Sequence, residues 1–276
     1  MHTPTAPVVE YDLTRAADTK RPLPTPPAGP EDGGQRIFDL VVGSLLTAVA
    51  LPVVALAWLV VCLTSAGPGF YTQTRVGRFG RPFRIVKLRT MYHACEAASG
   101  PQWSGPGDPR VTPVGRVLRR LHIDELPQLW NVLAGEMSLV GPRPERPEFA
   151  GPLSRVLPGY ADRLLVRPGL TGLAQVQLPP DSDIGSVRRK LVLDRWYVTG
   201  RSVWLDARLV TATGFYVCGL SAAAVRRLGR LPDPLAAAVA DPLADTVLED
   251  NPATGPGPRE EARDGTSERS SSQRSS

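Results

Sequence analysis

Cysteine and histidine are scarce in this sequence of 276 residues, with three of each. The cysteines Cys62, Cys95 and Cys218 lie far apart without a C-x-x-C pair, and the histidines show no i,i+4 pair. These absences argue against a disulfide framework and a structural zinc site, and they predict a reducing compartment. The sequence also lacks a G-x-S-x-G motif, which argues against a hydrolase with a serine triad.

Lysine is rare as well, because only three of the 32 Lys and Arg residues are Lys. Arginine suits fixed, bidentate phosphate binding better than lysine does, although the bias can also reflect codon usage. The formal net charge is +5, but residues 66–220 alone contain 21 basic and 12 acidic residues. This segment predicts an anionic partner, and composition leaves open nucleic acid, a phosphorylated substrate or a membrane surface.

One long hydrophobic run is present. Residues 37–63 contain a single charged residue, Asp39. As a helix the run would be about 40 Å long at about 1.5 Å per residue, against a bilayer core of about 30 Å. It starts late and lacks an A-x-A site before Ser65, which argues against a signal peptide. We therefore predict a membrane helix over residues 35–65.

Two features favour a membrane helix that does not cross the bilayer. Pro52 lies near its middle, removes a backbone donor and predicts a kink. Both flanks are basic, and the positive-inside rule places such flanks in the cytoplasm. We expect a re-entrant helix that bends at Pro52, and a kinked spanning helix is the alternative. The flanking basic residues are Lys20, Arg21, Arg36, Arg75, Arg78, Arg81, Arg84 and Lys87.

The remaining chain divides by composition. Residues 1–34 predict a disordered, proline-rich arm, and residues 221–276 predict a largely disordered tail. Residues 66–220 predict a compact α+β domain, mainly helical, with a small β-hairpin; its last helix is either core or an interfacial helix at the bilayer. The hairpin is expected over residues 70–76 and 83–88, a short strand over 172–177, and helices over 114–121, 126–133, 149–157, 184–198 and 203–220.

Asp124 and Glu125 are the clearest candidates for chemistry. They lie just before Pro127, which suits the first turn of a helix, so both carboxylates are expected at a positive helix N-terminus. An ionised Asp is a competent nucleophile toward phosphorus. A neighbouring Glu can hold Mg²⁺ together with substrate phosphate oxygens. The simpler alternative is that both residues only cap the helix.

Five basic residues near this pair in the sequence are predicted to bind substrate phosphate: Lys87, Arg89, Arg119, Arg143 and Arg167. Arg143 lies between two prolines and Arg167 precedes Pro-Gly, and such stiff backbone lowers the entropy lost on binding. Cations around two carboxylates predict a pyrophosphate site with Mg²⁺. We exclude nucleic-acid binding, which needs basic residues interleaved with aromatics along one element.

Five motifs occur in order: IVKLRTM, DPRVTPVGRVLRR, DELPQLWNVLAGEMSLVGPRPE, RPGLTGLAQV and LDRWYV. With them the chain resembles the bacterial sugar transferase family, the monotopic polyprenyl-phosphate phosphoglycosyl transferases. The resemblance covers about residues 35–220. No large multi-span domain precedes the motifs, so the chain looks like the small form of the family.

The resemblance implies a two-step reaction. Asp124 matches the catalytic Asp, which attacks the sugar-linked phosphate of a nucleotide sugar, expected to be a UDP-sugar, and releases UMP. Polyprenyl phosphate, expected to be undecaprenyl phosphate, then displaces the Asp from the covalent phosphosugar. Glu125 matches the acidic partner of Mg²⁺. Arg119 and Arg143 match phosphate-binding positions, and Arg167 matches the basic residue before Pro-Gly.

The resemblance also implies a location. Arg36, Asp39 and Pro52 match the entrance and the break of the family's re-entrant helix, which anchors the catalytic domain on the cytoplasmic face of the cytoplasmic membrane. The product would enter exopolysaccharide or other glycan assembly, with downstream glycosyltransferases as possible partners. A non-catalytic, membrane-anchored scaffold of such an assembly is the alternative.

Three departures from the family pattern are visible. Gln35 replaces a frequent Lys and is expected to lose a lipid head-group contact. Leu51 replaces the Ser that commonly precedes the proline, which is expected to weaken the bend. Leu121 and His122 replace a pair of small hydroxyl residues before the carboxylates. The sequence leaves open whether His122 is a neutral surface residue or tunes their charge.

Overall fold

The computed structural model describes residues 33–96, 100, 107–181, 183–234 and 237–238. The predicted N-terminal arm, except its last two residues, and the tail beyond residue 238 lie outside this part of the chain. The fold is α+β and mainly helical, with two two-stranded sheets among the described residues. The elements are α1 Gly33–Thr64, β1 Phe70–Val76, η1 Arg78–Gly80, β2 Pro82–Leu88, α2 Pro113–Arg120, η2 Ile123–Gln128, α3 Leu129–Ala134, β3 Ser138–Val140, α4 Pro147–Val156, η3 Tyr160–Leu165, β4 Gly169–Thr171, α5 Ile184–Gly200, α6 Val203–Val217 and α7 Ala222–Leu228.

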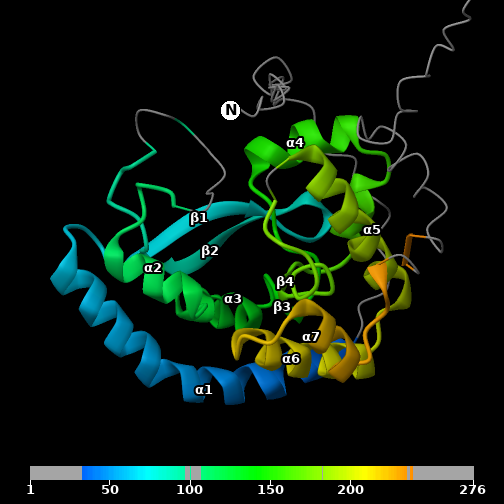
Figure 1. The fold of residues 1–276 in the computed structure, drawn as a ribbon, viewed down its shortest axis with the longest axis horizontal. Helices are drawn as coiled ribbons and strands as arrows, with labels where there is room; N and C mark the ends of the chain where they lie inside the picture. The colour runs from blue at the N-terminus through cyan, green and yellow to red at the C-terminus, as the bar shows by residue number, and fades with distance from the viewer. Residues whose placement is uncertain (1–32, 97–99, 101–106, 182, 235–236, 239–276) are drawn as a thin grey trace, which may run out of the picture.

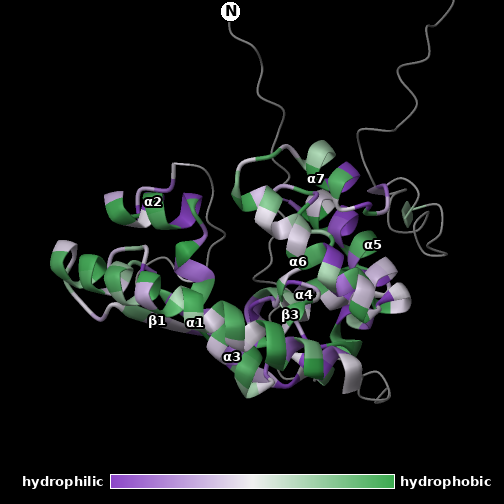
Figure 2. Cartoon of the chain, turned by 90° about the horizontal axis from the view of Figure 1, so that it is seen from below, coloured by the Kyte–Doolittle hydropathy of each residue, from purple (hydrophilic) through white to green (hydrophobic). Residues whose placement is uncertain are grey.

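Helix α1 runs along one side of the molecule and is continuous through Pro52 (Figure 1). One face is buried against the rest of the protein along the whole length of the helix. Its buried residues are Gln35, Asp39, Gly43, Ala50, Val54, Ala57 and Val61. The opposite face is apolar and exposed, and α1 is largely green in the hydropathy view from below (Figure 2). By length and composition α1 could cross a membrane, and only 22% of its most apolar window is buried.

The N-terminal end of α1 is fixed to the globular part by two side chains. The Nε2 of Gln35 donates to the Tyr197 hydroxyl and to a carboxylate oxygen of Asp206, both at 3.0 Å. Arg36 donates to the carbonyls of Val132 and Leu133 at 2.7 Å each, at the C-terminal end of α3. Gln35 is therefore buried, and its amide is used within the protein.

Asp39 of α1 is fully buried. Its Oδ1 accepts hydrogen bonds of 2.9 Å from the Ser138 hydroxyl and from the Leu139 amide of β3. A single charge in an apolar run is thus explained by hydrogen bonding to a strand rather than by contact with solvent. Together with Gln35 and Arg36 it makes the first two turns of α1 part of the domain.

The predicted hairpin is confirmed. Strands β1 and β2 pair antiparallel from Phe70 opposite Leu88 to Val76 opposite Pro82. The connecting turn passes through Phe79 and Gly80, both with positive φ, at 57° and 74°.

The strand predicted over residues 172–177 is wrong. The second sheet pairs β3 in parallel with β4, which ends at Thr171, and residues 172–177 form turns instead. Three glycines cause the difference, because a Cβ at Gly169 would lie 2.1 Å from the Gly141 amide nitrogen and one at Gly172 would lie 2.2 Å from the Gly141 carbonyl oxygen. The close backbone contact confines pairing to the short segment before Gly172.

The helices after β4 extend beyond the predicted domain. In α6, Leu205 and Leu209 are buried while Trp204 is 73% exposed, so this helix has both a core face and an exposed face. Helix α7 packs beside α6 and lies within residues 221–276, which the sequence suggested to be tail. Val225 of α7 and the following Leu231 are buried in the main core.

Candidate active site

The carboxylate pair lies in a short 3-10 helix, not at the start of an α-helix. The expected helix start near Pro127 is wrong, since η2 begins at Ile123 and α3 begins only at Leu129. His122 precedes η2 with φ of 55°, a left-handed conformation that turns the chain sharply after α2. Asp124 and Glu125 therefore occupy the first turn of η2, and their amide groups still lie near its positive end.

Asp124 lines a cavity of about 1420 Å³ and is itself 7% exposed. Within the described residues, no hydrogen bond or ion pair reaches its carboxylate, which leaves both oxygens available. Burial raises the pKa of Asp124, and the neighbouring Glu125 raises it further, while Lys87, Arg119 and Arg143 act in the opposite direction. Asp124 is thus surrounded by basic side chains, but none of them forms a hydrogen bond or ion pair with its carboxylate within the described residues.

Glu125 has the opposite environment. It accepts from the Nζ of Lys87 at 2.7 Å and from both terminal nitrogens of Arg143, at 2.5 and 3.1 Å. Burial raises the pKa of Glu125, but the charges of Arg143 and Lys87 outweigh it and hold the pKa well below its usual range. Lys87 comes from β2 and Arg143 from the loop after β3, so Glu125 joins two separate elements.

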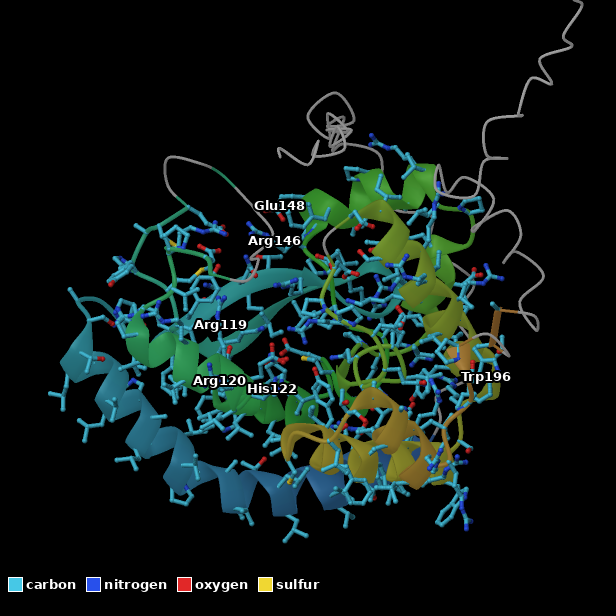
Figure 3. All side chains as sticks on the ribbon, in the orientation of Figure 1. Arg119, Arg120, His122, Arg146, Glu148 and Trp196 are labelled. Atoms are coloured by element: carbon cyan, nitrogen blue, oxygen red, sulfur yellow. The ribbon has the colours of Figure 1, made fainter. Side chains whose placement is uncertain are left out.

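Arg119 completes the basic surroundings. It lies near the end of α2, its Nε donates to the Thr90 hydroxyl at 2.8 Å, and it lines the same cavity. Figure 3 shows Arg119 and His122 near each other at the end of α2. Three of the five predicted phosphate-binding residues, Lys87, Arg119 and Arg143, are therefore brought together around the carboxylate pair.

The other two predicted phosphate-binding residues have different partners. The buried guanidinium of Arg89 donates to the carbonyls of Ser65 and Ala66, each at 2.7 Å, and so holds the C-terminal end of α1. Arg167 donates from Nε to the Gly135 carbonyl at 3.0 Å and does not line the cavity. Both arginines bind main-chain carbonyls that follow helix ends, and Arg89 also lines the cavity.

A second charged group on the cavity wall was missed by the sequence analysis. Arg75 of β1 donates to the Pro144 carbonyl at 3.1 Å and lies 3.8 Å from Glu145. Arg146 pairs with Glu96 at 3.0 Å. Strand alternation could have identified Arg75, because it shares the face of β1 that carries Tyr71 and Gln73 toward the cavity.

His122 has an exposed ring that contacts α6. The centroids of the His122 and Tyr216 rings are 5.7 Å apart, and both residues line the cavity. The ring therefore packs at the mouth of the cavity on the side of α6.

The described residues contain no group of three or more His, Cys, Asp or Glu side chains that could hold a metal. Mg²⁺ needs only one or two carboxylates when substrate phosphates supply further oxygens. Asp124 and Glu125 provide such a pair, so the donor set fits a Mg²⁺ ion bound together with a diphosphate and does not fit a metal cage built from protein alone.

A buried carboxylate pair, three converging cations and a long helix with an exposed apolar face are the features that the comparisons with known proteins have to explain. A family model described as bacterial sugar transferase matches residues 31–219, and the chain belongs to this family. It is therefore a sugar transferase.

Curated relatives are similar to this chain over about two thirds of its length. A Caulobacter vibrioides protein named UDP-glucose:undecaprenyl-phosphate glucose-1-phosphate transferase is 44% identical over 197 residues, 71% of this chain and 73% of the relative. An Aeromonas hydrophila UDP-N-acetylgalactosamine-undecaprenyl-phosphate N-acetylgalactosaminephosphotransferase is 41% identical, over 65% of this chain and 42% of the relative. The exopolysaccharide production protein PSS of Rhizobium leguminosarum is 35% identical, over 65% of this chain and 92% of the relative. The chain thus spans less than half of some longer relatives.

Proposed function

We propose that the protein transfers a phosphosugar from a UDP-sugar to undecaprenyl phosphate, as a membrane step of exopolysaccharide or other glycan assembly. The observation that carries this proposal is the Asp124 carboxylate, which is buried in a large cavity, unbound, and surrounded by Lys87, Arg119 and Arg143. The names of the relatives support the substrate classes.

The proposed reaction has two displacements at one phosphorus atom. An Asp124 oxygen attacks the phosphate linked to the sugar, the bond to the bridging oxygen breaks, and UMP leaves with that oxygen. An oxygen of polyprenyl phosphate then attacks the same phosphorus and releases Asp124. Neither step needs a proton transfer, so the main requirement is charge neutralisation, which Lys87, Arg119 and Arg143 supply.

We propose Mg²⁺ as the cofactor, with Glu125 as its main protein ligand. When bound, the ion would add positive charge beside the diphosphate. Lys87 and Arg143 already hold both Glu125 oxygens. A diphosphate that attracts these two cations would free Glu125 for the metal, so substrate and metal binding should be cooperative.

We also propose that α1 is re-entrant and that the catalytic domain faces the cytoplasm. Both ends of α1 are bound to one globular body, through Arg36 at the start and through Arg89 near the end. A spanning helix would place these ends on opposite sides of a bilayer. The test replaces the three native cysteines by Ser and introduces Gly33→Cys or Thr64→Cys. Protection of both positions from an impermeant reagent outside intact cells is expected, and labelling of either one contradicts the proposal.

The reaction is tested by identifying the released nucleotide. Incubation with Mg²⁺, a UDP-sugar and undecaprenyl phosphate should yield UMP, whereas UDP would mean ordinary glycosyl transfer. Intact-protein mass spectrometry without the lipid should detect a phosphosugar adduct, and Asp124→Asn should abolish both the adduct and turnover. Binding of the UDP-sugar with no product from any lipid phosphate would favour the scaffold alternative.

A further inference from the structure

Arg143 lies on a loop that is held through its carbonyl groups. The loop, residues 141–145, follows β3, and its prolines Pro142 and Pro144 have no backbone N–H to donate. Four consecutive carbonyls each accept a hydrogen bond from another part of the chain. The donors are the Gly169 amide to Pro142, Arg163 to Arg143, Arg75 to Pro144 and the Val76 amide to Glu145. Arg163 therefore acts on the backbone of the residue that contacts Glu125.

The Arg143 side chain depends on this backbone for its place. It is 41% exposed and extends to Glu125, so packing does little to fix it. A cavity of about 10 Å³ lies against the loop and is lined by Pro142, Pro144 and Arg163 among other residues. Such a volume admits roughly one water, so the loop has space into which it can shift. The hydrogen bond from Arg163 opposes that shift at residue 143.

Arg163 is itself firmly held. Its Nη2 donates to the Arg143 carbonyl at 3.0 Å and lies 2.8 Å from a carboxylate oxygen of Asp194. Its Nη1 donates to the Tyr160 hydroxyl at 3.0 Å. The side chains of Arg163 and Asp194 are only 10% and 5% exposed, and a buried, planar guanidinium with three partners keeps one orientation. The pair joins η3 to α5 and extends this rigidity to the loop.

We propose that Arg163, fixed by Asp194, is a positioning residue that places Arg143 against Glu125 and the substrate diphosphate. Neither Arg163 nor Asp194 is among the described residues that line the cavity of Asp124, so both act through Arg143. Helix α5, which carries Asp194, and α2 lie toward opposite ends of the molecule (Figure 1). The inference rests on the function proposed above and adds to it a pair of residues outside the cavity.

A second ion pair between the same two elements provides a matched control. Asp162 of η3 lies 2.8 Å from Arg195 of α5, and neither residue belongs to the cavity lining within the described chain. Lysine keeps the charge of Arg163 but has one donor nitrogen in place of a planar fork. It therefore cannot hold Asp194, Tyr160 and the loop together. Arg163→Lys is the test variant, and Arg195→Lys is its control.

A double-mutant cycle separates positioning from general stability. Arg163→Lys should lower kcat/KM for UMP release about tenfold or more, because a misplaced cation loses much of its effect. In the Arg143→Lys background the same change should cost less than about twofold, since the contact that it supports is already lost. Arg195→Lys should have no effect in either background. Equal losses in both backgrounds, or no loss from Arg163→Lys, overturn the proposal.

Asp194→Asn gives an independent answer where Arg163→Lys folds poorly. The amide keeps the shape and an oxygen acceptor but removes the charge that faces Arg163. The loss in kcat/KM should be smaller than that of Arg163→Lys and should also disappear in the Arg143→Lys background. Asp162→Asn is the control and should match the unsubstituted protein. A loss from Asp194→Asn that persists undiminished in the Arg143→Lys background contradicts the proposal.

Binding of UDP with Mg²⁺ keeps the result independent of turnover. Titration calorimetry on the full chain in detergent should find the Kd of UDP raised about threefold or more by Arg163→Lys, and unchanged by it in the Arg143→Lys background. If this coupling appears but no UMP is ever released from a UDP-sugar, the positioning stands and the proposed reaction fails. If UMP is released and Arg163→Lys alters neither its rate nor the Kd, the positioning fails and the proposed reaction stands.

Discussion

At the scale of single residues, the two adjacent carboxylates are made different by their neighbours. Glu125 is bound by Lys87 and Arg143, while Asp124 keeps a free carboxylate and a raised pKa. Of the five cations that the sequence analysis selected, the structure brings Lys87, Arg119 and Arg143 together around the carboxylate pair. The sequence could not show that Arg89 and Arg167 bind main-chain carbonyls, because the partners of a guanidinium are not visible in it.

The raised pKa of Asp124 has a consequence for pH dependence. A carboxylate whose pKa is raised is protonated at a higher pH than usual, and a protonated Asp124 cannot attack phosphorus. Single-turnover UMP release at constant Mg²⁺ should therefore fall on acidification with a midpoint above the ordinary Asp value of 3.8. A midpoint at or below that value would contradict the burial of the nucleophile.

Arg143→Lys tests the geometry of the contact with Glu125. Lysine keeps the charge but cannot donate from two nitrogens to both Glu125 oxygens. Loss of one charged hydrogen bond predicts a fall in kcat/KM of about tenfold to a hundredfold in steady-state assays. Arg155→Lys, at an exposed position of α4 outside the cavity lining, is the control and should have no effect.

At the scale of elements, the hydrophobic run predicted α1, and two β-rich runs separated by a short loop predicted the hairpin correctly. The strand over residues 172–177 and the helix start near Pro127 failed for a common reason. The strand depends on the close backbone contact at Gly172, and the helix start depends on the left-handed turn at His122. Neither feature changes the periodicity of the side chains from which the elements were predicted.

The buried hydrogen bonds of Gln35 give a prediction for the docking of α1. Burial raises the pKa of Asp206 to about 6, from the ordinary Asp value of 3.8. The folded protein therefore loses stability as the pH rises from 3.8 toward 6, because the unfolded chain ionises first. Gln35→Lys would place an ammonium beside this carboxylate and offset the cost. The slope of Tm against pH in this range should be less negative for the variant than for the unsubstituted protein. Identical slopes would mean that position 35 does not contact Asp206.

At the scale of the whole molecule, one body carries an apolar surface on one side and a basic cavity beside it. Residues 66–220 were expected to form the domain, but its core also uses α1 and α7. The sequence analysis did not separate residues 221–250, which are rich in Ala, Leu and Val, from the polar residues that follow, and Val225 and Leu231 lie in this first part.

The exposed apolar face of α1 predicts that the protein partitions into membranes rather than into the soluble fraction. Val41 and Leu45 are each 66% exposed, so Val41→Asp with Leu45→Asp should leave thermal stability in detergent nearly unchanged. Each charge opposes insertion into hydrocarbon by roughly 2.5–3.5 kcal/mol at most. Sedimentation of cell membranes should therefore find more of the double variant in the supernatant. A protein that stays fully with the membranes would show that this face is not inserted.

The hydrogen bond between Gln35 and Asp206 also bears on the order of folding during synthesis. Its two residues are 171 positions apart, so the apolar segment leaves the ribosome long before the partner that holds its first turn has been made. The domain can therefore fix the first turn of α1 only after Asp206 has been synthesised, so this contact forms late relative to the synthesis of α1.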